Sequence, residues 1–322
     1  METRKIISFG NSSFVISMPK GWIRENKLKK GDSLNIEEKK DELLIYPGQN
    51  DKKEEPKQIT INIDGKGISL IRTEVVSAYM NGYDTIEIQG PVEKDAPKIK
   101  ALLRDLSGLE IIQQDARKIV AKDLLNMEEI SILTLIRRMD NIVRSMLIDS
   151  VKSIHEDHSE EIAERDRDVN RLVHLAQRVI RSAMLDSRLA KKLEKTNFGL
   201  LTDWIMVNKL EKIGDKSKRI ARFLRESNLD ASEKKELEKI YVDIKEKYFE
   251  VMTAYYKKDL PAAFSIENTS MGRIDKCNDF IKERQNANAH KLIEYMKSLS
   301  TSVRDTARRI MEMEAGNQEL EK

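Results

Sequence analysis

The sequence has few of the residues that mark secreted, disulfide-bonded or membrane-spanning proteins. Its 322 residues include one cysteine, Cys277, so no disulfide can form within the chain and no CxxC pair is present to bind a metal through thiolates. No apolar run approaches the roughly 18 residues that span a bilayer, and residues 1–5 lack the apolar core of a signal peptide. We therefore expect a cytoplasmic protein without a transmembrane segment.

Aromatic residues are also scarce, at 5%, whereas 35% of the residues are charged. Together with abundant Leu, Ile, Met, Lys and Glu, this composition is typical of long amphipathic helices. A chain of this length exceeds one ordinary hydrophobic core and predicts two or three domains. Because the net charge is only +3, a surface for nucleic acid must come from a local excess of basic residues.

Such an excess lies near the N-terminus, where residues 1–31 carry seven Lys or Arg and two Glu. The same stretch predicts short strands at 14–18, 33–37 and 43–46, with one helical turn at 21–26. About fifty residues of short strands are too few to close a barrel alone, so we expect two copies to intertwine as a homodimer. The side chains that we assign to DNA phosphates are Arg4, Lys5, Lys20 and Arg24.

This segment, residues 1–47, resembles the SpoVT/AbrB family of swapped-hairpin DNA-binding domains. The resemblance rests on Ser13-Phe-Val-Ile-Ser-Met-Pro19, on Arg24 after the helical turn, and on the turn Gly31-Asp32. It implies a dimeric swapped-hairpin β-barrel, in which Arg24 takes the place of a DNA-contacting arginine.

One departure from the family pattern concerns the loop Gly10-Asn11-Ser12-Ser13, which has no arginine where DNA-binding members often carry one. Recognition at this loop would depend on polar side chains. The family also includes members that only dimerise or bind a toxin partner, so a dimerisation clasp without DNA binding is the alternative.

A polar, charged segment at 48–57 predicts a linker. Residues 58–124 then alternate between strand and helix periodicity, with strands at 58–64, 85–89, 110–114 and 118–121 and helices at 68–80 and 95–107. We expect a small α/β domain there. Asp64-Gly-Lys-Gly67 lacks the spacing of a phosphate loop, and the role of the domain stays open between spacer, dimer interface and small-molecule sensor.

Helical periodicity dominates residues 126–316 and predicts six helices, with breaks near 156–159, 187–197, 227–232, 258–261 and 286–288. Two segments recur: Asp166–Leu172 is echoed by Asp275–Ile281, and Ile213–Ile220 by Val303–Ile310. The repeat indicates two three-helix units in tandem, each with acidic side chains on two of its helices.

The most informative motif in this region is Glu211-Lys-Ile-Gly214-Asp215. Two carboxylates four residues apart on a helix repel each other, and Gly214 costs roughly 1 kcal/mol of helix propensity relative to Ala. The motif is explained if a cation or another backbone lies close to it, because two carboxylates form an oxygen platform for a metal ion. A solvated helix face with flanking lysines is the alternative.

Leu210-Glu-Lys-Ile-Gly-Asp215-Lys-Ser-Lys-Arg-Ile-Ala221 closely resembles the signature of PhoU phosphate-signalling proteins. The resemblance covers residues 126–316. It implies a pair of three-helix bundles that hold multinuclear metal, iron or zinc, and a regulatory part in phosphate uptake beside a Pst-type ABC transporter. The metal ligands that it implies here are Asp166, Asn170, Glu211, Asp215, Asp275, Asp279 and Asp305.

Three positions depart from the PhoU pattern. Thr301 and Asn170 replace carboxylates, and Lys216 stands where a histidine is common. Each missing carboxylate removes a charged oxygen ligand, which would weaken a site or change its metal preference.

The sequence thus predicts a mainly α, multidomain protein that responds to phosphate and regulates transcription through DNA. The runner-up is a signalling adaptor that never touches DNA. A metal-storing or phosphate-hydrolysing protein is a third class. The sequence argues against it, because it contains no evident nucleophile paired with a base.

Overall fold

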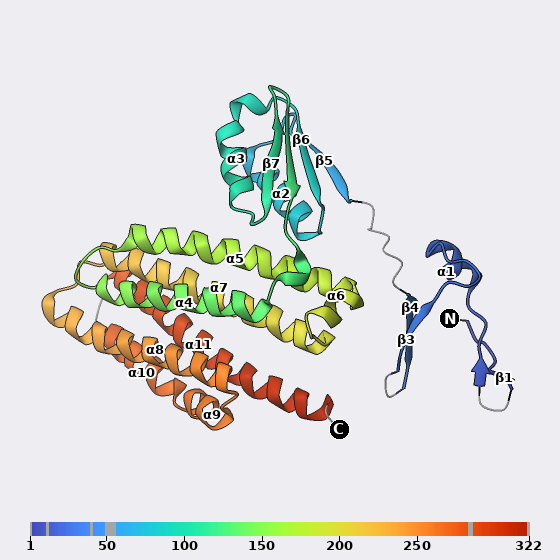
Figure 1. Ribbon diagram of the computed structural model, residues 1–322. Helices are drawn as coiled ribbons and strands as arrows, with labels where there is room; N and C mark the ends of the chain where they lie inside the picture. Colours follow the sequence, from blue (N-terminus) through green and yellow to red (C-terminus); the bar gives the residue numbers. More distant parts are fainter. Residues whose placement is uncertain (1, 11–12, 39–40, 49–55, 283–285, 321–322) are drawn as a thin grey trace. The chain divides into compact units, whose positions relative to one another are not determined.

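The computed structural model describes residues 2–10, 13–38, 41–48, 56–282 and 286–320. The chain forms two compact units, Met1–Glu55 and Pro56–Lys322. We call the first unit the head, and we divide the second into an α/β subdomain, residues 56–125, and a helical body, residues 126–320 (Figure 1). The chain is mainly α, which confirms that part of the prediction. None of the described helices combines the length and apolar character needed to cross a bilayer.

The head consists of short strands and one short helix. Strand β1 (Ile7–Phe9) pairs antiparallel with β2 (Ser13–Val15), and β3 (Leu34–Glu38) pairs antiparallel with β4 (Leu43–Pro47). Pro19 precedes helix α1 (Lys20–Glu25) as its N-cap residue, a position that suits proline because it lacks an N–H. The described residues of the head form two separate two-stranded sheets and not a closed barrel.

The α/β subdomain is one four-stranded sheet with helices packed on it. Its elements are β5 (Gln58–Asn62), α2 (Ile68–Met80), β6 (Thr85–Gln89), η1 (Val92–Lys94), α3 (Ala96–Arg104), β7 (Leu109–Gln114) and β8 (Lys118–Asp123). The strand order is β5-β6-β8-β7. Strands β5 and β6 run parallel, because α2 carries the chain back between them, and the other neighbours are antiparallel. Alternate isoleucines such as Ile61, Ile86 and Ile88 form its core.

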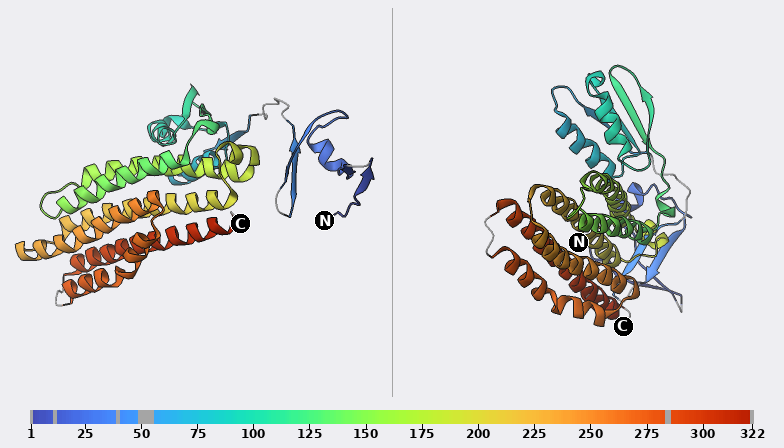
Figure 2. Two further views of the ribbon diagram at one scale, coloured as in Figure 1. Left: turned by 60° about the horizontal axis from the view of Figure 1, so that its bottom comes forward. Right: turned by 90° about the vertical axis from the view of Figure 1, so that its left-hand side faces the viewer.

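The helical body follows a 3-10 turn, η2 (Met127–Glu129). Its helices are α4 (Ile132–Lys152), α5 (Ser159–Leu185), α6 (Ser187–Lys192), α7 (Asn197–Glu226), α8 (Ala231–Lys257), α9 (Leu260–Asn268), α10 (Ser270–Ile281) and α11 (Ala287–Leu320). Helices α4, α5 and α7 pack against one another, and α8 to α11 pack together. The long helices lie side by side, with α7 against α11 and α4 against α8 (Figure 2).

The helix count differs from the sequence prediction at two places. A short helix, α6, occupies the predicted break at 187–197, and the predicted fifth helix is divided at Thr269 into α9 and α10. The division is stabilised by Arg273, which is 3% exposed and donates to the Ile266 carbonyl at 2.9 Å and to Thr269 Oγ1 at 3.2 Å. The bond to Ile266 satisfies a carbonyl near the end of α9, where a helix leaves its last carbonyls without an intrahelical partner.

A buried ion pair joins the α/β subdomain to the helical body. Arg178 of α5 is 1% exposed, and its Nη2 lies 2.5 Å from Asp123 Oδ2 at the end of β8. The guanidinium also lies over the Tyr79 ring, 4.3 Å from the centroid, and Tyr79 donates to the Ser107 carbonyl. Burial raises the pKa of Asp123, while the charge of Arg178 opposes the rise. Each charge therefore depends on the other to stay buried.

Arg178→Met should destabilise the chain by about 3–5 kcal/mol, because it leaves the Asp123 carboxylate buried without a partner. The measurement is denaturant unfolding of the full chain. The double variant Arg178→Met with Asp123→Asn is the control, and it should recover part of the loss because no charge is then buried alone. If Arg178→Met alone were as stable as the wild type, the ion pair would not hold the two parts together.

Candidate functional site

The basic side chains assigned to DNA are all on the surface of the head. Lys20 and Arg24 lie on α1 and are exposed, and no carboxylate among the described residues forms an ion pair with either of them. Arg4 precedes β1, where it pairs with Glu2 and donates to Ser17 Oγ at 3.4 Å. Lys5 is also exposed. The prediction for the 10–13 loop falls partly on residues 11–12, which lie outside the described residues.

The head also exposes its apolar side chains. None of its described residues is buried, and Phe14 on β2 is 75% exposed. The other large apolar side chains that are exposed in the head are Ile6, Ile7, Phe9, Val15, Ile16, Ile36 and Leu43. Monomeric proteins rarely expose so much apolar surface in one small unit, so the head as described lacks a core of its own.

In the helical body, α5 and α7 bring three of the predicted ligands together around a lysine. Lys218 Nζ lies 2.6 Å from Asp166 Oδ2 and 3.2 Å from Asp215 Oδ1. Asn170 donates to the same Asp166 oxygen at 3.3 Å, and Asp215 also accepts from Arg219 at 2.8 Å. The lysine therefore bridges the two helices, and its ammonium group lies between the two carboxylates.

The pKa directions agree with this arrangement. Burial raises the pKa of Glu211, and the charges of Asp215 and then Asp166 raise it further. Burial would lower the pKa of Lys218, but its bonds to Asp166 and Asp215 outweigh that effect and raise it. Glu211 is thus the member of the group whose negative charge is least compensated.

The residues as arranged do not fit a metal ion. No group of three or more His, Cys, Asp or Glu side chains in the described part of the chain is placed to hold one. The ammonium of Lys218 occupies the space between Asp166 and Asp215 where a cation would bind, so a divalent ion would have to displace it. The assignment of iron or zinc to these residues stays a prediction.

The second predicted group is arranged differently. Asp275 and Asp279 on α10 are exposed, whereas Asp305 on α11 faces α7. Its carboxylate lies 3.3 Å from Lys209 Nζ and 3.3 Å from Arg304 Nη2. Thr301, which replaces a carboxylate, donates to the Lys297 carbonyl of its own helix at 2.9 Å.

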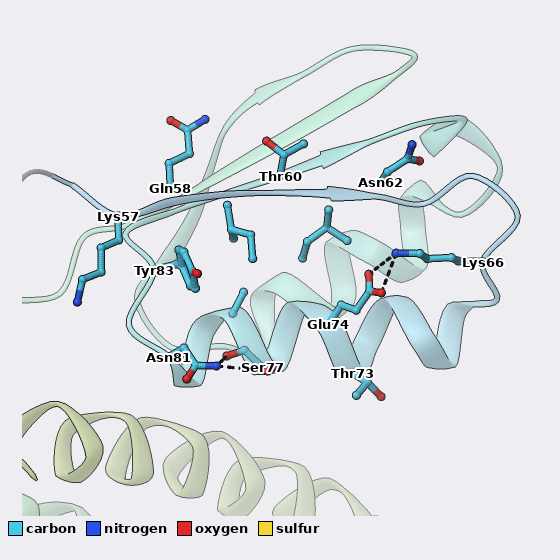
Figure 3. A pocket seen from close by; sticks show the side chains of 13 residues that line it. Lys57, Gln58, Thr60, Asn62, Lys66, Thr73, Glu74, Ser77, Asn81 and Tyr83 are labelled. Carbon is cyan, nitrogen blue, oxygen red and sulfur yellow. Dashed lines mark hydrogen bonds and ion pairs between the residues drawn. The ribbon is translucent and has the colours of Figure 1, made fainter. Parts of the chain in front are cut away.

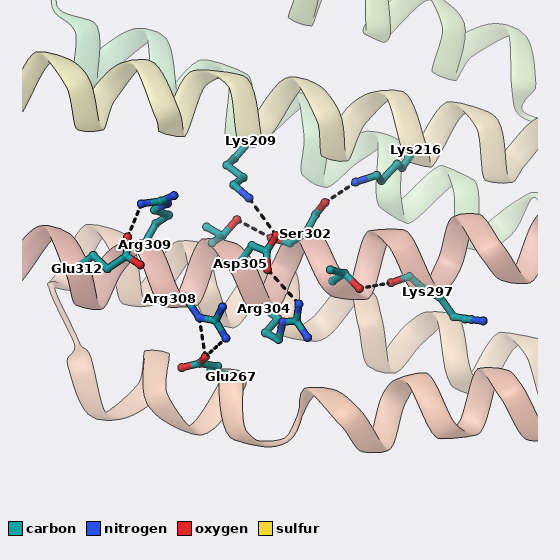
Figure 4. Close-up of polar contacts among 12 residues, drawn as sticks. Lys209, Lys216, Glu267, Lys297, Ser302, Arg304, Asp305, Arg308, Arg309 and Glu312 are labelled. Carbon is teal, nitrogen blue, oxygen red and sulfur yellow. Dashed lines mark hydrogen bonds and ion pairs between the residues drawn. The ribbon is translucent and has the colours of Figure 1, made fainter.

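Lys209 and Lys216 of α7 reach polar side chains of α11 (Figure 4). Lys216 donates to Ser302 Oγ, and burial together with the charges of Lys209 and Lys212 lowers its pKa. Arg308 pairs with Glu267 at 2.6 Å. Lysine and arginine thus neutralise Asp305 in this half of the body. Lys209 was not predicted as a partner of Asp305, because nothing in the spacing of either helix indicates this contact.

The atoms nearest to a Cβ built at Gly214 belong to side chains of α4 and not to another backbone. A Cβ at this position would lie 3.6 Å from Met146 and 3.6 Å from Val143 of α4. These are ordinary van der Waals distances, so the glycine belongs to the packing of α7 on α4.

Comparisons with known families match two separate segments of the chain. The PhoU domain model matches residues 136–224, from α4 to the end of α7. The model described as antidote-toxin recognition MazE, bacterial antitoxin, matches residues 7–53. The predicted combination of an AbrB-like segment with a PhoU segment is confirmed. Searches of curated proteins and of solved structures find no match.

Glu211→Gln tests the charge balance of the α5/α7 group. Because the folded-state pKa of Glu211 is raised above 4.5, stability falls as pH rises through the interval between the unfolded and folded values. We expect the variant to melt at a higher temperature than the wild type at neutral pH, on the order of 1–3 °C, and to melt equally below about pH 4. Glu110→Gln, at an exposed position, should change neither.

The same melting curves test the metal prediction. If Glu211 ligated iron or zinc, adding the ion would stabilise the wild type and not Glu211→Gln. If the acidic group holds no metal, Glu211→Gln should melt at a higher temperature than the wild type in the presence of a chelator. A variant that melts below the wild type in chelator would contradict the charge repulsion assigned to Glu211.

Gly214→Ala should stabilise the chain by about 1 kcal/mol, because alanine favours the helix and the added methyl group meets Val143 and Met146 without a clash. Gly272→Ala is the matched control, since its Cβ would face open space in α10. Both should raise the free energy of unfolding. A loss of stability for Gly214→Ala alone would show that α7 and α4 pack more tightly than described.

Proposed function

We propose that the chain is a phosphate-responsive transcriptional regulator, whose head binds DNA and whose helical body receives the phosphate signal. The observation that carries the proposal is the presence, in one chain, of a MazE-like match over residues 7–53 and a PhoU match over residues 136–224 of the body. We assign no catalytic step to it. DNA and the inner face of a membrane transporter are both accessible from the cytoplasm, so we place the activity of the chain there.

The proposed DNA surface is the exposed basic set of the head. Lys20 and Arg24 lie four residues apart on α1, so both point from one face of the helix. Neither has an ion pair with a described carboxylate, and this leaves their charges available to phosphates. Contacts of this kind position a protein on DNA, and side chains at the base edges then determine the sequence that it reads.

Dimerisation of the head is the second part of the proposal. Its apolar side chains, such as Phe14 and Ile36, are exposed in the single chain, and its two hairpins do not close on each other. A second head could cover these side chains by exchanging hairpins, as in a swapped-hairpin barrel. Two heads would bind DNA more strongly than one without any new contact, since the second binds from a high effective concentration.

The body would receive the signal through a Pst-type phosphate transporter, acting at the membrane surface. Helix α5 offers a route from the body to the rest of the chain, because it carries both Asp166 and Arg178. These residues are twelve positions apart, roughly 18 Å along a helix. A shift of α5 that changes the Asp166–Lys218 pair would also move the side chain that anchors the α/β subdomain.

A signalling adaptor that does not bind DNA is the second candidate. The observation that favours it is the exposed apolar surface of the head. A head that only dimerises needs this apolar surface, whereas it does not need the basic residues. In that case the head would only dimerise, and the body would act through a protein partner.

Salt dependence separates the two candidates. If the head contacts phosphates, duplex affinity should fall steeply between low and physiological salt, with a log–log slope of about −0.9 per contact. Arg24→Ala should weaken binding and reduce the slope by about 1 for each head that is engaged. Fluorescence anisotropy at several salt concentrations measures both. Lys94→Ala, at an exposed position of the α/β subdomain, is the control and should bind as the wild type.

Absence of duplex binding by the wild type at low salt would contradict the regulator and favour the adaptor. Light scattering of Arg24→Ala shows whether the variant keeps its oligomeric state. A loss of binding that accompanies a loss of the dimer would not count as a lost phosphate contact.

A further inference from the structure

The two edge strands of the sheet in the α/β subdomain differ: β7 has features that discourage pairing with another strand, and β5 does not. At one edge, β7 carries a register irregularity between Ile111 and Gln113, and it contains Glu110. Bulges and charges of this kind discourage an edge strand from pairing with another chain. At the other edge, β5 is regular over Gln58–Asn62 and has no charge, no proline and no bulge. It is therefore the edge open to a further strand.

The backbone of β5 presents its free groups at alternate residues. The Ile63 N–H donates to the Gln89 carbonyl at 2.8 Å, and the Lys57 carbonyl accepts from the Asp84 N–H at 2.8 Å. Odd-numbered residues thus face β6. In a parallel pair, the N–H and C=O of one residue point to the same side and those of the next residue to the other. Gln58, Thr60 and Asn62 consequently direct their N–H and C=O groups outward.

We propose that β5 pairs antiparallel with β5 of a second copy of this chain, with Thr60 on the two-fold axis. In that register Thr60 lies opposite Thr60 of the second copy, and Gln58 lies opposite Asn62. All three outward residues of each strand then become hydrogen-bonded pairs, which exchange both N–H···O bonds. The strand Gln-Ile-Thr-Ile-Asn reads the same in both directions by side-chain type, as a symmetric interface requires.

The side chains also fit this register. Figure 3 shows Gln58, Thr60 and Asn62 on the face of the sheet away from α2, where two carboxamides can meet across the pair. On the other face, Ile59 is partly exposed in an open cavity of about 990 Å³ between β5 and α2, lined also by Ala78 and Tyr83. The pairing sets Ile59 opposite Ile61 of the second copy and covers that apolar surface.

The position of β5 in the chain agrees with a second copy as the occupant. The strand begins at Gln58, three residues after the last residue of the head. In the dimer proposed for the head, two β5 strands are therefore tethered at a high effective concentration. The inference rests on the proposed function only for that tether, and it requires no DNA binding.

Cysteine cross-linking of the full chain tests the register. Residues opposite each other in a hydrogen-bonded antiparallel pair have Cα atoms about 5.5 Å apart, within the range of a disulfide. Thr60→Cys should therefore form a covalent dimer on mild oxidation. Gln58→Cys alone and Asn62→Cys alone should not, whereas their equimolar mixture should. The wild type is the control for Cys277, which is fully buried.

A proline variant then separates this interface from the head. Thr60→Pro removes an N–H that points away from β6, a place where an edge strand tolerates proline. Thr60→Pro is introduced into both the Gln58→Cys chain and the Asn62→Cys chain before they are mixed. The yield of covalent dimer should then fall about tenfold, because the pair loses two hydrogen bonds. DNA affinity of Thr60→Pro, measured separately, should stay within about twofold of the wild type.

Three results would overturn the inference. One is a chain that is dimeric by light scattering while Thr60→Cys forms no covalent dimer, because the head alone would then hold the copies. Another is equal cross-linking of Thr60→Cys and Gln58→Cys, which indicates another register or random collision. The third is a monomeric chain. Only the last also contradicts the proposed dimer of the head, and none bears on phosphate contacts.

Discussion

The ion pair between Arg178 and Asp123 holds the α/β subdomain and the helical body together within the second unit of this protein. A charged pair with 1% and 5% of its side chains exposed is stable only while both partners stay in place. The aromatic ring of Tyr79 covers the guanidinium, and the pKa of that tyrosine is raised to about 12 by burial, so it remains a neutral hydrogen-bond donor. The α/β subdomain therefore cannot tilt on α5 without exposing or separating two charges. A movement of α5 that keeps this ion pair intact would carry the end of β8 with it.

Electrostatics within the body follow the same principle of local compensation. Asp166 and Asp215 share Lys218, and Asp305 is held by Lys209 and Arg304. Such pairs at the boundary between helices are weak individually. The Lys218–Asp166 pair links α7 to α5, and the Lys209–Asp305 pair links α7 to α11. Helix α7 thus contacts α5 on one side and α11 on the other through groups whose charges a bound ion or a partner protein would disturb. This makes α7 the element through which a signal would reach both halves of the body.

Sequence reasoning succeeded where one segment determines its own structure. Helix α2 begins and ends at the predicted residues 68 and 80, and β6 at 85 and 89, because apolar spacing and the Asn81-Gly82 break are local signals. It failed where distant residues decide. Nothing near Arg178 in the sequence indicates Asp123, fifty-five residues away, as its partner. Lys218 belongs to the Leu210–Ala221 motif, but helical spacing alone does not predict that its ammonium forms an ion pair with Asp166 of α5. The sequence pattern of the head also did not predict that its apolar residues, such as Phe14 and Ile36, would be exposed in the single chain.

Occupancy of DNA in living cells tests the central claim, that phosphate status controls where this chain binds. The full-length protein would be immunoprecipitated with its DNA from cells grown in phosphate-rich medium and from cells starved of phosphate. The account predicts discrete binding sites near genes of phosphate uptake, with occupancy that changes severalfold between the two conditions. Occupancy that is uniform along the genome, or discrete sites whose occupancy is the same in both media, would contradict it.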